Sequence, residues 1–192
     1  MYITTNLLLS FLLALPIASI ELRSGDEENF NEHLPSSRGL IDCFVWYSLQ
    51  GDPSALLAKT AKPPCRVPTS FPRTLSGGWS VDTACDAAKQ PNTCSLHTGA
   101  YCCYRNALKS TGPGAQACYD EFGQWISDPW LGAGTIDKET PLGSIIQQGK
   151  HVFADVLPYY SCCKTLFASQ PETCNRYYEK RPPGQCEDKP VV

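Results

Sequence analysis

The chain has 192 residues and a formal net charge of −3, with 16 prolines, 14 glycines and 11 cysteines. The slight excess of acidic residues argues against nucleic acid or an anionic membrane surface as the main partner. So many cysteines predict a covalent framework that supplements a small apolar core, and such a framework forms in an oxidising compartment. The frequent prolines and glycines favour many turns and few long regular elements.

The N-terminal segment has the order of features that is typical of a secretory signal peptide. An apolar run from Leu7 to Leu15 precedes Pro16 and the small residues Ala18 and Ser19. The run is too short to span a bilayer, which disfavours a signal anchor. We expect cleavage after Ser19, because Pro16 disfavours a cut after Ala18. We expect no membrane span in the mature chain. The predicted organisation is a signal peptide over 1–19, a flexible lead-in over 20–39, a cysteine-rich domain over 40–187 and a tail over 188–192.

The first third of the predicted domain mixes extended and irregular segments. Residues 41–47 combine β-branched and aromatic side chains, which predicts a strand. Residues 51–71 are rich in proline and are expected to form a loop held in place by Cys65. A short helix is predicted over residues 82–90, with Asp82 as its N-cap and Cys85 inside it.

The middle of the chain carries the first of two pairs of adjacent cysteines, Cys102-Cys103. Adjacent cysteines rarely bond to each other because the small ring strains the peptide, so each is expected to reach a different segment. Residues 117–126 then predict a strand, a tight turn at Gly123 and a second strand. Residues 129–143 are predicted to be loop.

The C-terminal third is predicted to be mostly helical, which makes the whole domain a small disulfide-rich member of the α+β class. One short helix is expected from Gly149 to Leu157, ending at Pro158 because proline cannot donate a helical hydrogen bond. Two more are expected over residues 159–168 and 172–180.

His151 and Asp155 are the candidates for chemistry, because a spacing of four residues places both on one face of a helix. Such a pair is able to ligate a metal or to act as a general base. No third ligand or nucleophile stands at a recognisable spacing, so a structural hydrogen bond is the favoured interpretation. The sequence therefore predicts no catalytic, cofactor-binding or metal-binding residues.

The odd number of cysteines leaves at least one thiol unpaired or bonded to another chain. A buried free thiol and a covalent homodimer are both consistent with this count. The connectivity of the bridges does not follow from the spacing. The candidates for structural disulfides are Cys43, Cys65, Cys85, Cys94, Cys102, Cys103, Cys118, Cys162, Cys163, Cys174 and Cys186.

Taken together, these residues resemble the AMOP domain, an extracellular cysteine-rich module of adhesion-associated proteins. The resemblance runs from about Ile41 to Cys186, and it departs from the family pattern at Ala117, where a cysteine is common, and at the additional Cys102. The residues besides cysteine that carry it are Tyr119, Asp120, Gly123, Gly134, Thr135, His151, Asp155, Pro158, Tyr177, Arg181 and Pro182.

The resemblance implies a non-catalytic extracellular module without a cofactor. We therefore expect a secreted protein that acts in cell adhesion, or in interactions with extracellular matrix or cell-surface proteins. The alternative is a secreted signalling ligand that acts as a disulfide-linked dimer through the odd cysteine. A third hypothesis is a secreted hydrolase that uses His151 and Asp155.

Overall fold

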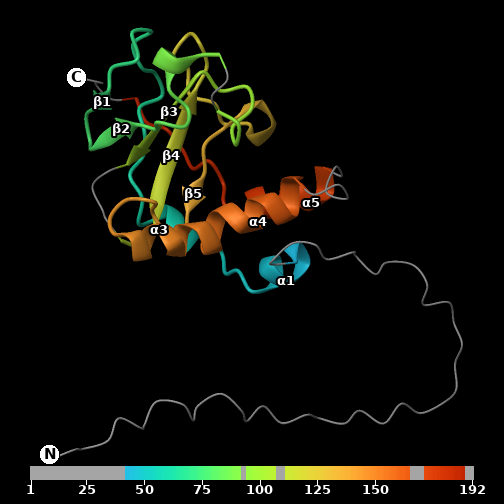
Figure 1. Ribbon diagram of the computed structural model, residues 1–192. Helices are drawn as coiled ribbons and strands as arrows, with labels where there is room; N and C mark the ends of the chain where they lie inside the picture. The colour runs from blue at the N-terminus through green and yellow to red at the C-terminus, as the bar shows by residue number, and fades with distance from the viewer. Residues whose placement is uncertain (1–41, 92–93, 107–110, 165–170, 189–192) are drawn as a thin grey trace, which may run out of the picture. The chain divides into compact units, whose positions relative to one another are not determined.

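A computed structural model describes residues 42–91, 94–106, 111–164 and 171–188 of the chain. The predicted signal peptide and lead-in lie outside the described residues. A five-stranded antiparallel sheet and several helices make up the described part, so the predicted α+β class is confirmed. The sheet keeps its strands in chain order: β1 (Thr74–Leu75), β2 (Trp79–Val81), β3 (Cys102–Asn106), β4 (Gly114–Tyr119) and β5 (Ile136–Asp137) (Figure 1).

The two faces of the sheet differ in chemistry because successive side chains of a strand point to opposite sides. One face is apolar and aromatic, with Tyr104 and Tyr119 packed edge to face at a centroid distance of 5.8 Å. On the other face Cys103 stands directly opposite Cys118, and the two form a disulfide across β3 and β4. The same face carries the polar side chain of Asp137 from β5.

A long helix follows the sheet, and it does not end at Pro158 as predicted. It consists of α3 (Ile145–His151), a π-helical turn (Val152–Val156), α4 (Leu157–Tyr159) and a second π-helical turn (Tyr160–Lys164) (Figure 1). Proline lacks the N–H that would bond the carbonyl of Ala154 four residues earlier. Here Arg181 replaces that donor, because its Nη2 donates to the Ala154 oxygen at 3.1 Å. The helix therefore continues through the proline.

The last helix, α5 (Pro171–Lys180), agrees with its predicted position. The predicted helix over 159–168 is described only as far as Lys164, and there it is part of the long helix.

The strand predicted over 41–47 is wrong, because this segment forms the helix α1 (Cys43–Ser48). Asp42 caps the helix by accepting a hydrogen bond from the Val45 N–H at 3.0 Å. Cys43 and Trp46 lie three residues apart and so face the same side, where the indole stacks on Tyr177 of α5 at 5.5 Å. Tertiary packing thus overrides the β propensity of these residues.

Two other predictions in the first half need correction. The predicted loop over 51–71 contains the short helix α2 (Ser54–Leu57). The predicted helix over 82–90 shrinks to a 3₁₀ turn, η1 (Ala87–Lys89), which is capped by Asp86 rather than by Asp82. A second 3₁₀ turn, η2 (Pro129–Leu131), lies in the segment predicted as loop.

The predicted tight turn at Gly123 is present, but the strand after it is reduced to two isolated bridges, one between Gln124 and Arg66 and one between Trp125 and Tyr119. Gly123 has φ +75°, a conformation that L side chains rarely adopt. A Cβ atom at this position would also lie 2.2 Å from the Val67 carbonyl oxygen.

All eleven cysteines lie in the part of the chain that the structure describes, and five disulfides join ten of them. The second pair of adjacent cysteines reaches two segments, because Cys162 bonds the helix α1 while Cys163 bonds α5. The bridges are Cys43–Cys162, Cys65–Cys186, Cys85–Cys94, Cys103–Cys118 and Cys163–Cys174.

The free thiol is that of Cys102, whose exposed fraction is 0%. It lies in the apolar core beside Tyr104 and Ala117. A bond to a second chain would require this core to open, so the burial of Cys102 disfavours a covalent homodimer through the odd cysteine.

Gly134 and Gly149 differ in the space around them, so alanine substitutions at the two positions should change the stability in opposite directions. A Cβ at Gly134 would lie 2.0 Å from the backbone oxygen of Gln116, whereas one at Gly149 in α3 would meet nothing within 4 Å. We expect Gly134→Ala to lower the free energy of unfolding by about 2–3 kcal/mol through steric overlap. Gly149→Ala should instead raise it by about 0.5–1 kcal/mol, because alanine restricts the unfolded chain and favours helix. Chemical denaturation measures both, and equal effects would contradict the packing described.

Candidate functional site

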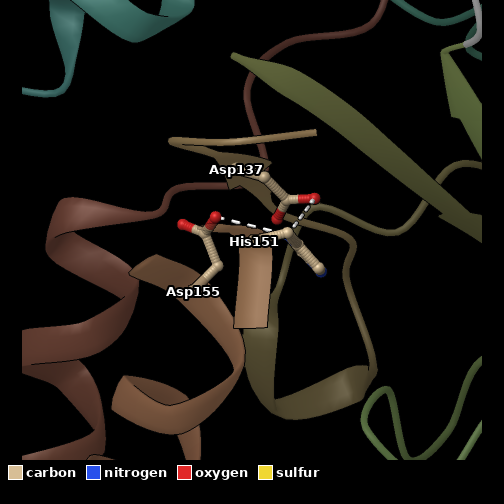
Figure 2. Close-up of side chains that lie close together, drawn as sticks. All are labelled: Asp137, His151 and Asp155. Carbon is tan, nitrogen blue, oxygen red and sulfur yellow. Dashed lines mark hydrogen bonds and ion pairs between the residues drawn. The ribbon is translucent and has the colours of Figure 1, made fainter. Parts of the chain in front are cut away.

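The predicted pair of His151 and Asp155 gains a third member in the structure, Asp137. His151 ends α3, Asp155 lies in the following π turn, and Asp137 ends β5. The imidazole Nδ1 is 3.3 Å from the Asp155 Oδ2 and 3.9 Å from the Asp137 Oδ2, and all three side chains are buried (Figure 2). The cluster therefore joins the edge of the sheet to the long helix.

Asp155 accepts hydrogen bonds from three parts of the chain. The backbone N–H groups of Lys138 and Glu139, just after β5, donate to its two oxygens at 2.9 and 3.1 Å. The Nε of Arg181, just after α5, donates to Oδ1 at 2.6 Å. Together with His151, these donors occupy both carboxylate oxygens.

Arg181 is almost fully buried and uses the rest of its guanidinium to hold further segments. Its Nη2 donates to the Gln50 Oε1 at 3.0 Å and to the Ala154 oxygen. Its Nη1 donates to the oxygen of Lys180, and its Cζ lies 5.1 Å from the ring centroid of Trp46. Arg181 thus connects the N-terminal helix to the long helix.

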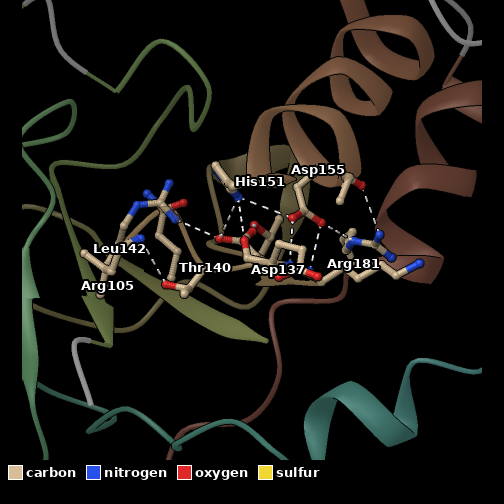
Figure 3. A network of polar contacts seen from close by, with 12 residues as sticks. Arg105, Asp137, Thr140, Leu142, His151, Asp155 and Arg181 are labelled. Atoms are coloured by element: carbon tan, nitrogen blue, oxygen red, sulfur yellow. Dashed lines mark hydrogen bonds and ion pairs between the residues drawn. The ribbon is translucent and has the colours of Figure 1, made fainter. Parts of the chain in front are cut away.

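Asp137 is paired with a second arginine, the partly buried Arg105 of β3. The Arg105 Nη1 donates to the Asp137 Oδ2 at 2.8 Å, and its Nε donates to the Asp82 Oδ2 at 2.8 Å. The hydroxyl of Thr135 donates to the other Asp137 oxygen at 3.0 Å. Figure 3 shows the result, a network with a guanidinium at each end and the Asp–His–Asp group between them.

The imidazole of His151 is held by acceptors. Its Nδ1 lies 2.8 Å from the backbone oxygen of Glu139, which can only accept, so Nδ1 carries a proton and donates. In the described residues its hydrogen bonds go to Glu139 and Asp155, and none goes to a Ser, Thr or Cys side chain. A general base needs a nucleophile or a substrate proton within reach. The contacts of His151 therefore fit a structural role.

Burial and neighbouring charges shift the pKa values of Asp137, His151 and Asp155 in different directions. Burial acts to raise the pKa of Asp155, but the hydrogen bonds from His151 and Arg181 hold it below its usual value. Burial acts to lower the pKa of His151, but the hydrogen bond to Asp155 and the charge of Asp137 raise it. Burial raises the pKa of Asp137 against the opposing charge of Arg105.

Asp137, His151 and Asp155 offer three ligand atoms that lie within 4.8 Å of one another. The donor types would suit a divalent cation. However, Arg105 and Arg181 already neutralise the two carboxylates, and a cation would stand between two guanidinium groups. These charges favour an internal ion-pair network over a metal centre.

Other residues singled out by sequence lie elsewhere in the fold. The Tyr119 hydroxyl donates to the oxygen of Pro64 at 2.8 Å, and Asp120 accepts hydrogen bonds from two N–H groups of the Gly123 turn. Tyr177 packs in the second core cluster, which contains Trp46 and Cys162. Pro182 accepts a hydrogen bond from the Ile136 N–H at 2.8 Å.

Sequence reasoning missed Arg105, Asp137 and Asp82 as members of the network. They are far apart in the chain and share no spacing with His151. The one available signal was the pair Gly134-Thr135, which lies just before Asp137.

The fold and this network define a small α+β domain that is held together by disulfides and a buried ion-pair network. The family model of the AMOP domain matches residues 40–190, and the chain belongs to this family. No curated protein and no solved structure matches the chain. Among the described residues, no helix has the length and apolar character that crossing a membrane requires.

Removal of the Arg181 side chain should destabilise the domain strongly. We expect Arg181→Ala to lower the free energy of unfolding by about 3–5 kcal/mol, because it leaves Asp155 buried without its ion-pair partner. Arg176→Ala is the matched control on α5. Its guanidinium lies over the exposed ring of Phe44, so its loss should cost less than about 1 kcal/mol. Urea denaturation measures both, and a similar cost for the two variants would contradict the role of Arg181.

The raised pKa of His151 makes its contribution to stability depend on pH. A group with a raised folded pKa stabilises fully below its unfolded pKa, about 6.5 for histidine, and loses this effect as the pH rises through the folded value. The groups that face the imidazole are Asp137, Asp155 and Arg105. We therefore expect the melting temperature of the wild type to exceed that of His151→Gln by more at about pH 6 than at about pH 8.5. A difference that grows with rising pH would refute this assignment.

Proposed function

We propose that this protein is a secreted, non-catalytic binding module that engages an extracellular or cell-surface protein. Membership of the AMOP family, which is associated with adhesion-related extracellular proteins, supports this proposal. The five disulfides support an oxidising compartment. The buried network around His151 supports the absence of catalysis, because its groups are committed to internal hydrogen bonds.

The observation that carries the proposal is an exposed apolar patch on the long helix. We call it the helix patch, and it consists of Ile145, Ile146, Val152 and Phe153. These residues occupy positions i, i+1, i+7 and i+8, so they gather on one side of the helix two turns apart. Gly149 between them leaves open space beside the backbone.

An apolar patch of this kind usually marks a surface that another molecule covers. Ile145, Ile146 and Phe153 are 86%, 75% and 63% exposed. A few well-packed residues near the centre of an interface supply most of its binding energy. The helix patch is therefore suited to bind a protein partner that has an apolar groove or face.

The alternatives have weaker support. A disulfide-linked signalling dimer needs an accessible odd cysteine, and Cys102 is buried. A hydrolase needs a nucleophile or an activated water near His151, and the contacts of this residue are structural. We therefore retain the binding module.

The test is binding of the purified secreted chain to the surface of cultured cells, with a charge placed in the helix patch. We expect Phe153→Glu to weaken saturable binding at least about tenfold, because it removes an apolar anchor and buries a charge. Phe122→Glu is the matched control, because Phe122 is similarly exposed (69%) but lies in the Gly123 turn. It should bind like the wild type, and both variants should keep the wild-type melting temperature. Failure of the chain to reach the medium, or equal loss in both variants, would overturn the proposal.

A further inference from the structure

The helix patch is symmetrical about Gly149. Ile145 and Ile146 precede this glycine by four and three residues. Val152 and Phe153 follow it by three and four residues. The backbone stays right-handed helical where α3 passes into the π turn, so all five residues lie on one continuous helix. Offsets of three and four residues return to the same side of a helix, so the four apolar side chains surround the glycine on one face.

This pattern is self-complementary when two copies of the helix pack antiparallel about a twofold axis at Gly149. In such a pair, a residue that follows the glycine by a given offset faces the residue that precedes it by the same offset in the other copy. Ile145 would face Phe153 of the second copy, and Ile146 would face Val152. Every apolar side chain of the patch thus meets another apolar side chain, and each contact occurs twice.

Gly149 allows the two helix backbones to approach each other closely. A Cβ atom at this position would meet nothing within 4 Å, so the space beside the backbone is open. Packed helices ordinarily have their axes about 8–10 Å apart, and a small residue at the crossing point permits separations at the short end of this range. The larger side chains on either side of the glycine can then interlock around the crossing.

The charged residue beside the crossing favours the antiparallel direction. Lys150 follows Gly149 by one residue, and Gln148 precedes it by one. Both side chains are exposed. In an antiparallel pair each lysine faces the glutamine of the other copy, whose amide oxygen can accept a hydrogen bond from the ammonium group. In a parallel pair each residue would face its own copy, and the two lysines would repel each other.

We propose that the helix patch joins two copies of this chain in a reversible, non-covalent antiparallel dimer. The inference rests on the proposed function, since it names the partner of the same patch as a second molecule of this extracellular protein. A second copy is favoured over an unrelated partner, because the groove of an unrelated protein would not require a pattern that is symmetrical about Gly149.

The size of the patch sets the expected affinity. A standard protein interface involves about 20–30 residues on each partner. The helix patch offers four exposed apolar side chains, so the contact lies at the small end of this scale. We therefore expect a dissociation constant on the order of 10 µM.

The first test is analytical ultracentrifugation of the purified secreted chain over a range of concentrations. We expect a reversible equilibrium between monomer and dimer. Gly149→Leu should weaken the dimer at least about tenfold, because the new side chain fills the space into which the second helix packs. The monomer should keep its melting temperature, since leucine is a good helix former. Asn175→Leu is the matched control, because it adds the same side chain at an exposed position of α5. It should dimerise like the wild type.

The second test examines which residues face each other. Ile145→Glu and Phe153→Lys each place a charge against an apolar side chain, so each variant alone should weaken the dimer at least about tenfold. A mixture of the two should associate about fivefold or more tightly than either alone, because the introduced charges have opposite signs and face each other in the mixed dimer. The matched control is a mixture of Ile145→Glu with Ile146→Lys, whose introduced charges do not face each other. This mixture should show no gain.

The dimer and the proposed function can fail separately. The dimer is refuted if the wild type stays monomeric up to about 200 µM, well above the expected dissociation constant. It is also refuted if Gly149→Leu dimerises as tightly as the wild type, or if the two mixtures behave alike. A monomeric wild type that binds cells, and loses this binding in Phe153→Glu, would overturn the dimer and leave the proposed function standing. A wild type that dimerises as described but does not bind cells would overturn the proposed function and leave the dimer standing.

Discussion

The buried ion pair between Arg181 and Asp155 is the interaction on which the arrangement of this domain depends. Asp155 receives the guanidinium, two backbone N–H groups that follow β5, and the imidazole of His151. A charge in such a place is costly unless every acceptor position is used. The segments after β5 and after α5 therefore have to meet the long helix at one point, which determines how helices and sheet are joined.

The same arginine explains why a proline is tolerated inside the long helix. Pro158 is fully buried, and the carbonyl of Ala154 that it leaves without a helical donor is satisfied by Arg181. The two π turns on either side of α4 lie in this same stretch. Arg181 thus satisfies two groups at once, the carbonyl that Pro158 leaves without a helical donor and the buried carboxylate of Asp155.

The sequence was informative where the signal is local. Helix α5 was predicted close to its observed bounds, and the spacing of His151 and Asp155 correctly placed them on one helix face. The failures have tertiary causes. Residues 43–48 form a helix because Trp46 packs on Tyr177, more than a hundred residues away, and the Arg105–Asp137 pair depends on strand register. The choice of Cys102 as the free thiol likewise depends on which face of β3 it occupies.

The disulfides have a mechanical consequence for a module that is pulled between two attachments. Tension applied between Cys43 and Cys186 can pass along the chain to Cys65 and across its bridge to Cys186. It can also cross from Cys43 to Cys162 and continue through the C-terminal helices. Neither covalent route includes the sheet, because β1 to β5 lie between residues 65 and 162. The strands therefore carry no load along these covalent routes, and force between Cys43 and Cys186 leaves the hydrogen bonds of the sheet intact.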